Sequence, residues 1–135
     1  MTDAARDVDR GEKLRVGEVD LWVDVAGDGH DTVVLLAGAD TPGFQWSPGF
    51  VDALVEVGFR VVRFDHRDCG RSSWLGSEAG YLLDDLAADL IGLLDVLALD
   101  AAHLVGRSMG GMVAQVAALD HRERVRSLTL LGSTA

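Results

Sequence analysis

Short apolar runs separated by polar turns dominate the first part of the chain. Residues 14–16 and 21–26 flank a turn-like segment, and the second run carries Leu, Val and Val at alternate positions. Alternation of this kind is typical of a half-buried strand, so the two runs predict an antiparallel hairpin. Residues 32–36, TVVLL, are instead continuously apolar. Such a run predicts a parallel-type strand that is covered on both faces.

Three later segments have helical spacing. In residues 82–97 leucines recur every three or four positions while the aspartates take other positions, which predicts an amphipathic helix with one buried stripe. Residues 50–57 and 109–119 predict two shorter helices. The segments 38–49 and 65–80 are rich in glycine and polar residues, so we expect them to be long loops.

The remaining apolar runs predict three more strands, at residues 60–64, 101–105 and 125–131. From residue 32 onward, strands and helices then alternate regularly. Alternation gives right-handed βαβ crossovers, so the expected fold class is α/β, with a doubly wound, mostly parallel sheet and an N-terminal antiparallel hairpin. We expect residues 1–13 to form a polar tail and residues 14–135 to form one domain.

Residues 106–110 read Gly-Arg-Ser-Met-Gly, a G-x-S-x-G motif between a predicted strand and a predicted helix. This context predicts a nucleophile elbow, a turn so tight that its central residue is strained. Gly106 and Gly110 remove side chains that would collide in such a turn. The turn would present the Ser108 hydroxyl at a helix N-terminus, where developing negative charge is favoured. Ser108 is therefore the candidate nucleophile, and the N–H of Met109 is a candidate oxyanion donor.

Three motifs together make the chain resemble the N-terminal part of an α/β-hydrolase. They are Leu-Ala-Gly-Ala at 36–39, similar to the family's oxyanion loop, Asp-His-Arg-Asp-Cys-Gly-Arg-Ser at 65–72, similar to its D-x-R-G-x-G-x-S turn, and the elbow at 106–110. The resemblance implies hydrolysis of an ester or similar acyl bond, with the N–H of Ala39 as the other oxyanion donor. Phe-Gln-Trp at 44–46 and Leu-Asp-His at 119–121 most resemble the aclacinomycin methylesterase-type hydrolases.

Two positions depart from the family pattern. Ala37 stands where the family often has histidine, so the oxyanion loop loses one orienting hydrogen bond, although its backbone N–H groups remain. Asp68 stands where the D-x-R-G turn has glycine, and aspartate is tolerated in turns. We expect the other charged residues of this turn, Asp65, Arg67 and Arg71, to hold it together through charge-assisted hydrogen bonds.

The family's triad runs Ser, then Asp or Glu, then His, but only residues 109–135 follow Ser108. The acids and the imidazole in that stretch are Asp120, His121 and Glu123. At 1.5 Å rise per residue they lie about 18 Å away, at the far end of the predicted helix, and cannot hydrogen-bond to Ser108. We therefore expect the triad acid and histidine, with the C-terminal half of the fold, to be missing from this chain.

Several residues near these motifs have alternative roles. For Ser108 the alternative is an ordinary helix N-cap. His66 follows a strand end, where open α/β sheets build their sites, but the family uses this loop structurally, so a replacement base is disfavoured. Arg107 either faces the site or faces solvent. Phe44 and Trp46 either line an apolar pocket or pack over the sheet, and packing is favoured.

Composition narrows the partners and the location. The 12 Lys and Arg against 22 Asp and Glu give a formal net charge of −10, which argues against nucleic acid and anionic membranes as partners. Cys69 is the single cysteine, and residues 1–12 lack the apolar segment of a secretion signal, so we expect a cytoplasmic protein. No Cys, His and carboxylate cluster has metal-ligand spacing, so neither a metal nor another cofactor is expected.

Other functions share these features. A perhydrolase or a carbon–carbon hydrolase of the same fold would carry every motif quoted above, whereas serine at the elbow disfavours epoxide hydrolases and haloalkane dehalogenases, which use aspartate there. A non-catalytic truncated fragment or binding protein is the alternative from another class. In either case, the resemblance implies a following strand that this sequence does not contain, so residues 125–131 would present an unpaired, apolar sheet edge, which favours self-association.

Overall fold

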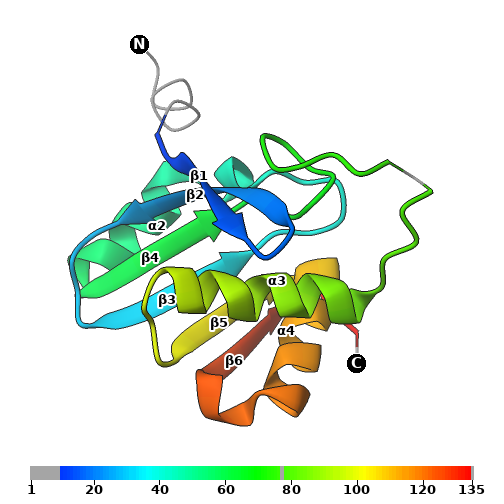
Figure 1. The fold of residues 1–135 in the computed structure, drawn as a ribbon. Helices are drawn as coiled ribbons and strands as arrows, with labels where there is room; N and C mark the ends of the chain where they lie inside the picture. The colour runs from blue at the N-terminus through cyan, green and yellow to red at the C-terminus, as the bar shows by residue number, and fades with distance from the viewer. Residues whose placement is uncertain (1–9, 77, 135) are drawn as a thin grey trace.

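The computed structural model describes residues 10–76 and 78–134. Its six strands form one sheet in the order β1-β2-β4-β3-β5-β6 (Figure 1). They are β1 (Glu12–Val16), β2 (Val19–Ala26), β3 (Asp31–Leu36), β4 (Phe59–Phe64), β5 (Ala102–Arg107) and β6 (Val125–Leu131). β2 pairs antiparallel with β1 and β4, whereas β3 pairs parallel with β4 and β5, and β5 pairs parallel with β6. The expected α/β fold class, with its hairpin and mostly parallel sheet, is confirmed.

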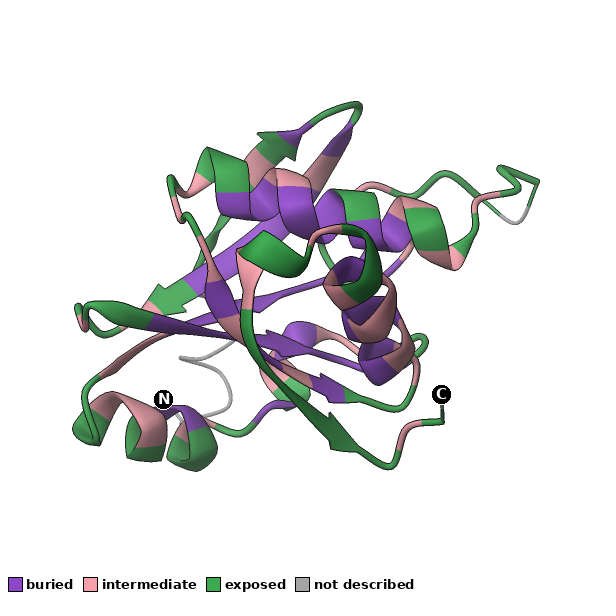
Figure 2. Ribbon diagram, turned by 90° about the horizontal axis from the view of Figure 1, so that it is seen from below, coloured by how far each residue is buried: buried purple, intermediate pink, exposed green. Residues whose placement is uncertain are grey.

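The helices cover both faces of this sheet (Figures 1 and 2). They are α2 (Pro48–Glu56), α3 (Leu83–Val96) and α4 (Met109–Asp120), with short 3-10 turns η1 (Gly43–Gln45) and η2 (Arg122–Arg124). The leucine stripe of α3 packs with α4 over one face, and α2 packs on the other face around Val51 and Trp46. The continuous apolar run of β3 is buried between these two cores, as its pattern predicts.

Some boundaries differ from the sequence-based expectations. β1 begins at Glu12, two residues before the expected strand and inside the expected tail, whose residues 1–9 lie outside the described part of the chain. α2 begins at Pro48 and not at residue 50, because Ser47 caps the helix by accepting a hydrogen bond from the Phe50 N–H at 3.2 Å. Proline suits the first helical position, because an N–H there would have no acceptor within the helix.

β6 lies at one edge of the sheet, and every residue after Val125 in this strand is exposed (Figure 2). Its parallel neighbour β5 is covered by α4 and is half buried along its length. The carboxyl ends of β3, β4 and β5 meet at the same edge of the sheet, because these strands are parallel. None of the described helices is long and apolar enough to cross a membrane.

Candidate active site

Ser108 lies between the end of β5 and the start of α4, and its backbone is in the left-handed region, with φ 52° and ψ −121°. Serine adopts this region rarely, and only where the surrounding structure imposes it. The side chain makes no capping hydrogen bond to the helix, and the residue is exposed. Ser108 thus occupies the N-cap position of α4 without the side-chain bond of an ordinary N-cap serine.

The two flanking glycines permit the close approach that creates this turn. A Cβ atom on Gly106 would lie 2.5 Å from the Cα of Gly111. A Cβ atom on Gly110 would overlap the carbonyl oxygens of Leu36 and Ala37, at the end of β3. The predicted reason for both glycines is confirmed, and the second one also brings α4 against the loop that follows β3.

That loop passes directly beside the serine. A Cβ atom on Gly38 would lie 3.5 Å from the Ser108 Cβ, which is ordinary van der Waals contact. Ala39 and Ser108 line the same open hollow of about 280 Å³. Met109 is the first residue of α4, so its N–H has no acceptor within the helix. The structure thus brings Ser108, Ala39 and Met109 to one place.

Gly38 and three polar residues also line the hollow beside Ser108, and the polar residues are Thr41, Gln45 and Arg107. Arg107 is exposed and also lines this hollow, so it meets both solvent and the candidate site. Thr41 and Gln45 belong to no motif that singles them out in the sequence. The only signal for them is their position as polar residues shortly after Ala39, in a loop whose path cannot be read from the sequence.

His66 is buried beneath this loop, with 3% of its surface exposed, and it does not border the hollow beside Ser108. Its Nε2 lies 3.1 Å from the carbonyl oxygen of Ala37. Burial lowers the pKa of His66, against the opposing effects of the Ala37 carbonyl and of the carboxylates of Asp89 and Asp65. His66 also lines a smaller hollow of about 70 Å³ together with Ala39 and Met109.

The charged residues of the turn that follows β4 bind it to its surroundings. Asp65 accepts hydrogen bonds from the N–H groups of Gly43 at 2.6 Å and Arg71 at 3.0 Å. Arg67 forms two hydrogen bonds of 2.7 Å to Asp89 of α3, which raise its pKa above the ordinary value. The expected charge-assisted bonds are present, but the partner of Arg67 is on α3 and not in the turn.

Cys69, in the same turn, is buried. Burial raises the pKa of its thiol to about 11, and the carboxylates of Asp65 and Asp40 act in the same direction. A thiol with this pKa is a poor nucleophile at neutral pH. Cys69 is therefore no competitor for Ser108.

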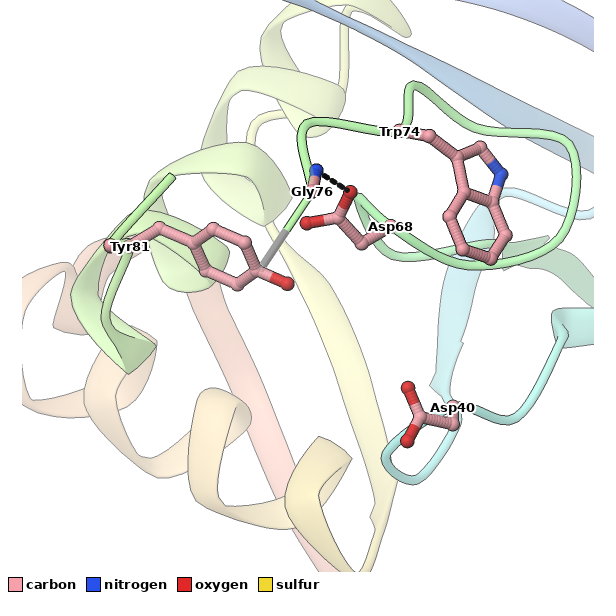
Figure 3. Close-up of a pocket in the computed structure, with 6 residues that line it drawn as sticks. Asp40, Asp68, Trp74, Gly76 and Tyr81 are labelled. Atoms are coloured by element: carbon pink, nitrogen blue, oxygen red, sulfur yellow. Dashed lines mark hydrogen bonds between the residues drawn. The ribbon is translucent and has the colours of Figure 1, made fainter. Parts of the chain in front are cut away.

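A larger hollow of about 340 Å³ adjoins the small one, since Asp40, Asp68 and Tyr81 line both (Figure 3). Burial acts to raise the pKa of Asp68, but hydrogen bonds from the N–H groups of Gly76 and Leu75 outweigh it and hold the pKa below its usual value. Asp68 is the residue that departs from the family's glycine. Its φ of 59° is a value that glycine adopts without strain.

The remaining candidates lie away from Ser108. Asp120 ends α4, and His121 and Glu123 follow it, so all three are at the opposite end of that helix from Ser108 (Figure 1).

Trp46 is buried and stacks on Phe50 with 5.5 Å between ring centroids, so its favoured packing role is confirmed. Within residues 10–76 and 78–134, no group of three or more His, Cys, Asp or Glu side chains is placed to hold a metal ion.

The sequence and the structure match those of known hydrolases. The model of the alpha/beta hydrolase fold family matches residues 31–135. Rhodomycin D methylesterase DnrP of Streptomyces peucetius is 42% identical over 116 residues, which are 84% of this chain and 39% of that protein. A 2-hydroxy-6-oxononadienedioate/2-hydroxy-6-oxononatrienedioate hydrolase of Paraburkholderia phymatum is 39% identical over 124 residues, which are 90% of this chain and 41% of that protein.

Among solved structures, a hydrolase from Pseudomonas aeruginosa PA01 superposes with a TM-score of 0.86 and 30% identity, and the match covers 94% of this chain and 47% of that one. The chain thus spans about two fifths of the length of the curated relatives it matches. The resemblance noted from the three sequence motifs is confirmed, including its similarity to methylesterases of this type.

Proposed function

Because the chain belongs to the α/β-hydrolase fold family, we propose that it is the nucleophile-bearing part of a serine hydrolase that cleaves an ester or similar acyl bond. The observation that carries this proposal is the backbone of Ser108, which is held at a positive φ with its hydroxyl free of any capping bond. Backbone strain of this kind clusters at active sites. Here it presents a hydroxyl beside the loop that contains Ala39.

In the proposed mechanism, the Ser108 Oγ attacks the carbonyl carbon of the substrate while a histidine takes the hydroxyl proton. The carbonyl electron pair moves onto oxygen, where the N–H groups of Ala39 and Met109 stabilise the oxyanion. The intermediate then expels the leaving group, which takes the proton back from the histidine, and leaves an acyl-serine. Water releases the acid by the same steps in reverse order.

Ser108 needs a general base, because an unassisted serine hydroxyl is a weak nucleophile. The arrangement of the described residues favours a base from elsewhere, since His66 is buried under the loop and His121 lies beyond the far end of α4. We infer that an Asp or Glu and a His outside these 135 residues complete the triad. Residues 14–135 then constitute one part of a larger hydrolase domain.

A small uncharged or anionic ester suits the hollow beside Ser108. Its volume of about 280 Å³ fits a compact acyl group, and Thr41, Gln45 and Arg107 offer hydrogen bonds to substrate oxygens. The methylesterase relative makes a methyl ester the first substrate to test. Neither a nucleic acid nor an anionic membrane is proposed as a partner, in view of the net charge of −10. We also propose a cytoplasmic location and a mechanism that needs no cofactor.

Cleavage of a carbon–carbon bond is the second candidate function. It is favoured by the 39% identity to the Paraburkholderia hydrolase, whose name gives a 2-hydroxy-6-oxo dienedioate or trienedioate as substrate. Both reactions use the same oxyanion site, so the described residues support them equally. The two reactions differ in their leaving group. We expect parts of the fold outside this chain to contact that group.

The proposal is tested by completing the domain. The chain is fused to the C-terminal half of a methylesterase relative and assayed with p-nitrophenyl acetate, p-nitrophenyl butyrate and a methyl ester. We expect ester hydrolysis that is lost in Ser108→Ala and is unchanged by a metal chelator. A fusion that folds but has no Ser108-dependent activity on esters or on a vinylogous 1,5-diketo acid would favour the non-catalytic alternative, and activity lost to the chelator would refute the cofactor-free mechanism.

A further inference from the structure

The loop between β3 and η1 is held at both ends by two consecutive residues of another segment. At its start, His66 contacts the Ala37 carbonyl, with 3.1 Å between Nε2 and oxygen. At its end, the Gly43 N–H donates to the Asp65 carboxylate at 2.6 Å. Both anchors directly follow β4, which is the parallel neighbour of β3. The loop is thus fixed to the carboxyl end of the adjacent strand.

These anchors are shielded from water. His66, Asp65 and Ala37 are each no more than 3% exposed. A buried polar group that loses its partner is left without water to replace it, so each bond is costly to break. The consequence is that the two ends of the loop cannot easily move independently of β4.

The protonation state of His66 agrees with this arrangement. A carbonyl oxygen only accepts, so Nε2 carries the proton and donates it to Ala37. Nδ1 is buried and has no partner among the described residues. Because burial keeps the pKa of His66 low, the ring is neutral at pH 7, which is consistent with one donor and one bare nitrogen.

The loop held in this way contains Gly38 and Ala39. Gly38 and Ala39 line the hollow beside Ser108, and Ala39 also borders the small hollow that His66 lines. His66 therefore stands directly behind the backbone that faces the nucleophile. Ala37, in turn, is the position at which the family often places its own orienting histidine.

We propose that His66 is a positioning residue, which together with Asp65 clamps the 37–43 loop so that the Ala39 N–H is aimed at the oxyanion formed on the Ser108 substrate. His66 takes no proton from Ser108 and touches no substrate; it acts through the Ala37 carbonyl. It supplies, from a different segment, the orienting bond that the alanine at position 37 cannot make. The proposal rests on the proposed function of Ser108 and Ala39.

The first test needs no catalytic activity. Amide hydrogen exchange is measured on peptides 37–46 and 86–94 of the wild-type chain, of His66→Phe, which cannot donate, and of His66→Gln, whose amide nitrogen replaces Nε2. His30→Phe, at an exposed position, is the matched control. We expect exchange in peptide 37–46 to be about tenfold faster in His66→Phe, and near the wild-type rate in His66→Gln and His30→Phe. Equal loop exchange in His66→Phe and wild type would overturn the clamp.

A second measurement covers the case in which His66→Phe also opens peptide 86–94 and so fails to fold. The ring nitrogens of wild-type His66 are observed by long-range ¹H–¹⁵N NMR between pH 5 and 8. At pH 7 we expect a protonated Nε2 and a bare Nδ1. A bare Nε2 with the proton on Nδ1 would overturn the proposal without any variant.

The catalytic readout uses the same variants in the completed domain. Because an oxyanion donor acts in the transition state, His66→Phe should lower kcat about 10- to 100-fold while KM changes by less than about threefold, and His66→Gln should restore most of kcat. An unchanged kcat in a folded His66→Phe enzyme would contradict the positioning role. If loop exchange responds as expected but wild-type enzyme has no Ser108-dependent activity, the proposed function fails and the clamp stands.

Discussion

The guanidinium of Arg63 in β4 and the carboxylate of Asp24 in β2 form an ion pair inside the sheet, with 2.7 Å between Nη2 and Oδ2. Both side chains are almost inaccessible, at 0% and 1% exposure. Arg10 adds two hydrogen bonds to the same carboxylate, at 2.7 and 2.9 Å. Arg63 also donates to the carbonyl of Trp46 at 2.8 Å, so the buried charge fixes the segment that leads into α2.

Removal of this carboxylate should be strongly destabilising. Asp24→Ala removes the carboxylate that pairs with the buried Arg63 guanidinium, so we expect the free energy of unfolding to fall by about 3–5 kcal/mol. Arg15→Ala is the control, because Arg15 and Asp20 form an exposed pair at 3.3 Å on the neighbouring strands, and should cost less than about 1 kcal/mol. Urea unfolding followed by circular dichroism measures both. Similar losses in the two variants would contradict the account of the buried pair.

Gly110 should be intolerant of any side chain. In Gly110→Ala the new methyl group meets the backbone carbonyls of Leu36 and Ala37, so we expect a loss of about 1–3 kcal/mol and a displaced elbow. Gly49→Ala, in the first turn of α2, meets no atom within 4 Å and should be neutral or stabilising. Thermal unfolding of the two variants distinguishes them. A neutral Gly110→Ala would mean that the elbow and the 37–43 loop are not tightly packed.

Mild acid should weaken the fold through His66. Burial lowers its pKa in the folded state, so below about pH 6.5 the unfolded chain binds a proton that the folded chain does not. The contribution of His66 to the free energy of unfolding is therefore fully present above pH 6.5. It falls as the pH decreases toward the lower folded-state pKa, by at most about 1.4 kcal/mol per pH unit. His66→Gln should remove this slope, and the exposed His30→Gln should keep it. An unchanged slope in His66→Gln would assign the effect to another group.

The exposed edge at β6 should promote self-association of the chain. Leu128, Leu130 and Leu131 are each at least 37% exposed there, and an unpaired apolar edge recruits other strands. The net charge of −10 opposes association at low salt, but salt screens it, so light scattering should show larger species as salt increases. Leu130→Lys should reduce this association, and Leu119→Lys, on the exposed side of α4, should not. A monomer at every salt concentration would show that the exposed edge at β6 does not mediate self-association.

The fold follows from the sequence where the relevant signal is local. The leucine spacing of α3 and the apolar run of β3 gave the correct element types. Burial of one face leaves a periodic apolar pattern, and burial of both faces of a strand leaves a continuous apolar run. The apolar spacing placed the start of α2 at residue 50, two residues late. The local signal for the true start is Ser47 followed by Pro48, a cap and a proline at the first helical position. Asp24 and Arg63 were not foreseen as buried, since each looks like a polar position when its strand is considered alone.

For the site, the same distinction between local and distant contacts applies. The Ser108 turn was predictable because a five-residue glycine spacing encodes it. The contact of His66 with Ala37 depends on β4 lying beside β3 and on a side-chain direction, neither of which a single sequence records. The borders of the hollow at Thr41, Gln45 and Arg107 depend likewise on how two loops meet in space.

The reactivity of Ser108 is tested most directly by covalent labelling. The 135-residue chain and the completed domain are treated with a fluorophosphonate, and the modified residue is identified by mass spectrometry. We predict stoichiometric labelling of Ser108 in the completed domain and none in Ser108→Ala. Because we infer that the base lies outside these 135 residues, we predict labelling at least about 10³-fold slower in the chain alone. Labelling at another residue of the completed domain would contradict the assignment of Ser108 as the nucleophile, and rapid Ser108 labelling in the chain alone would contradict the inferred external base.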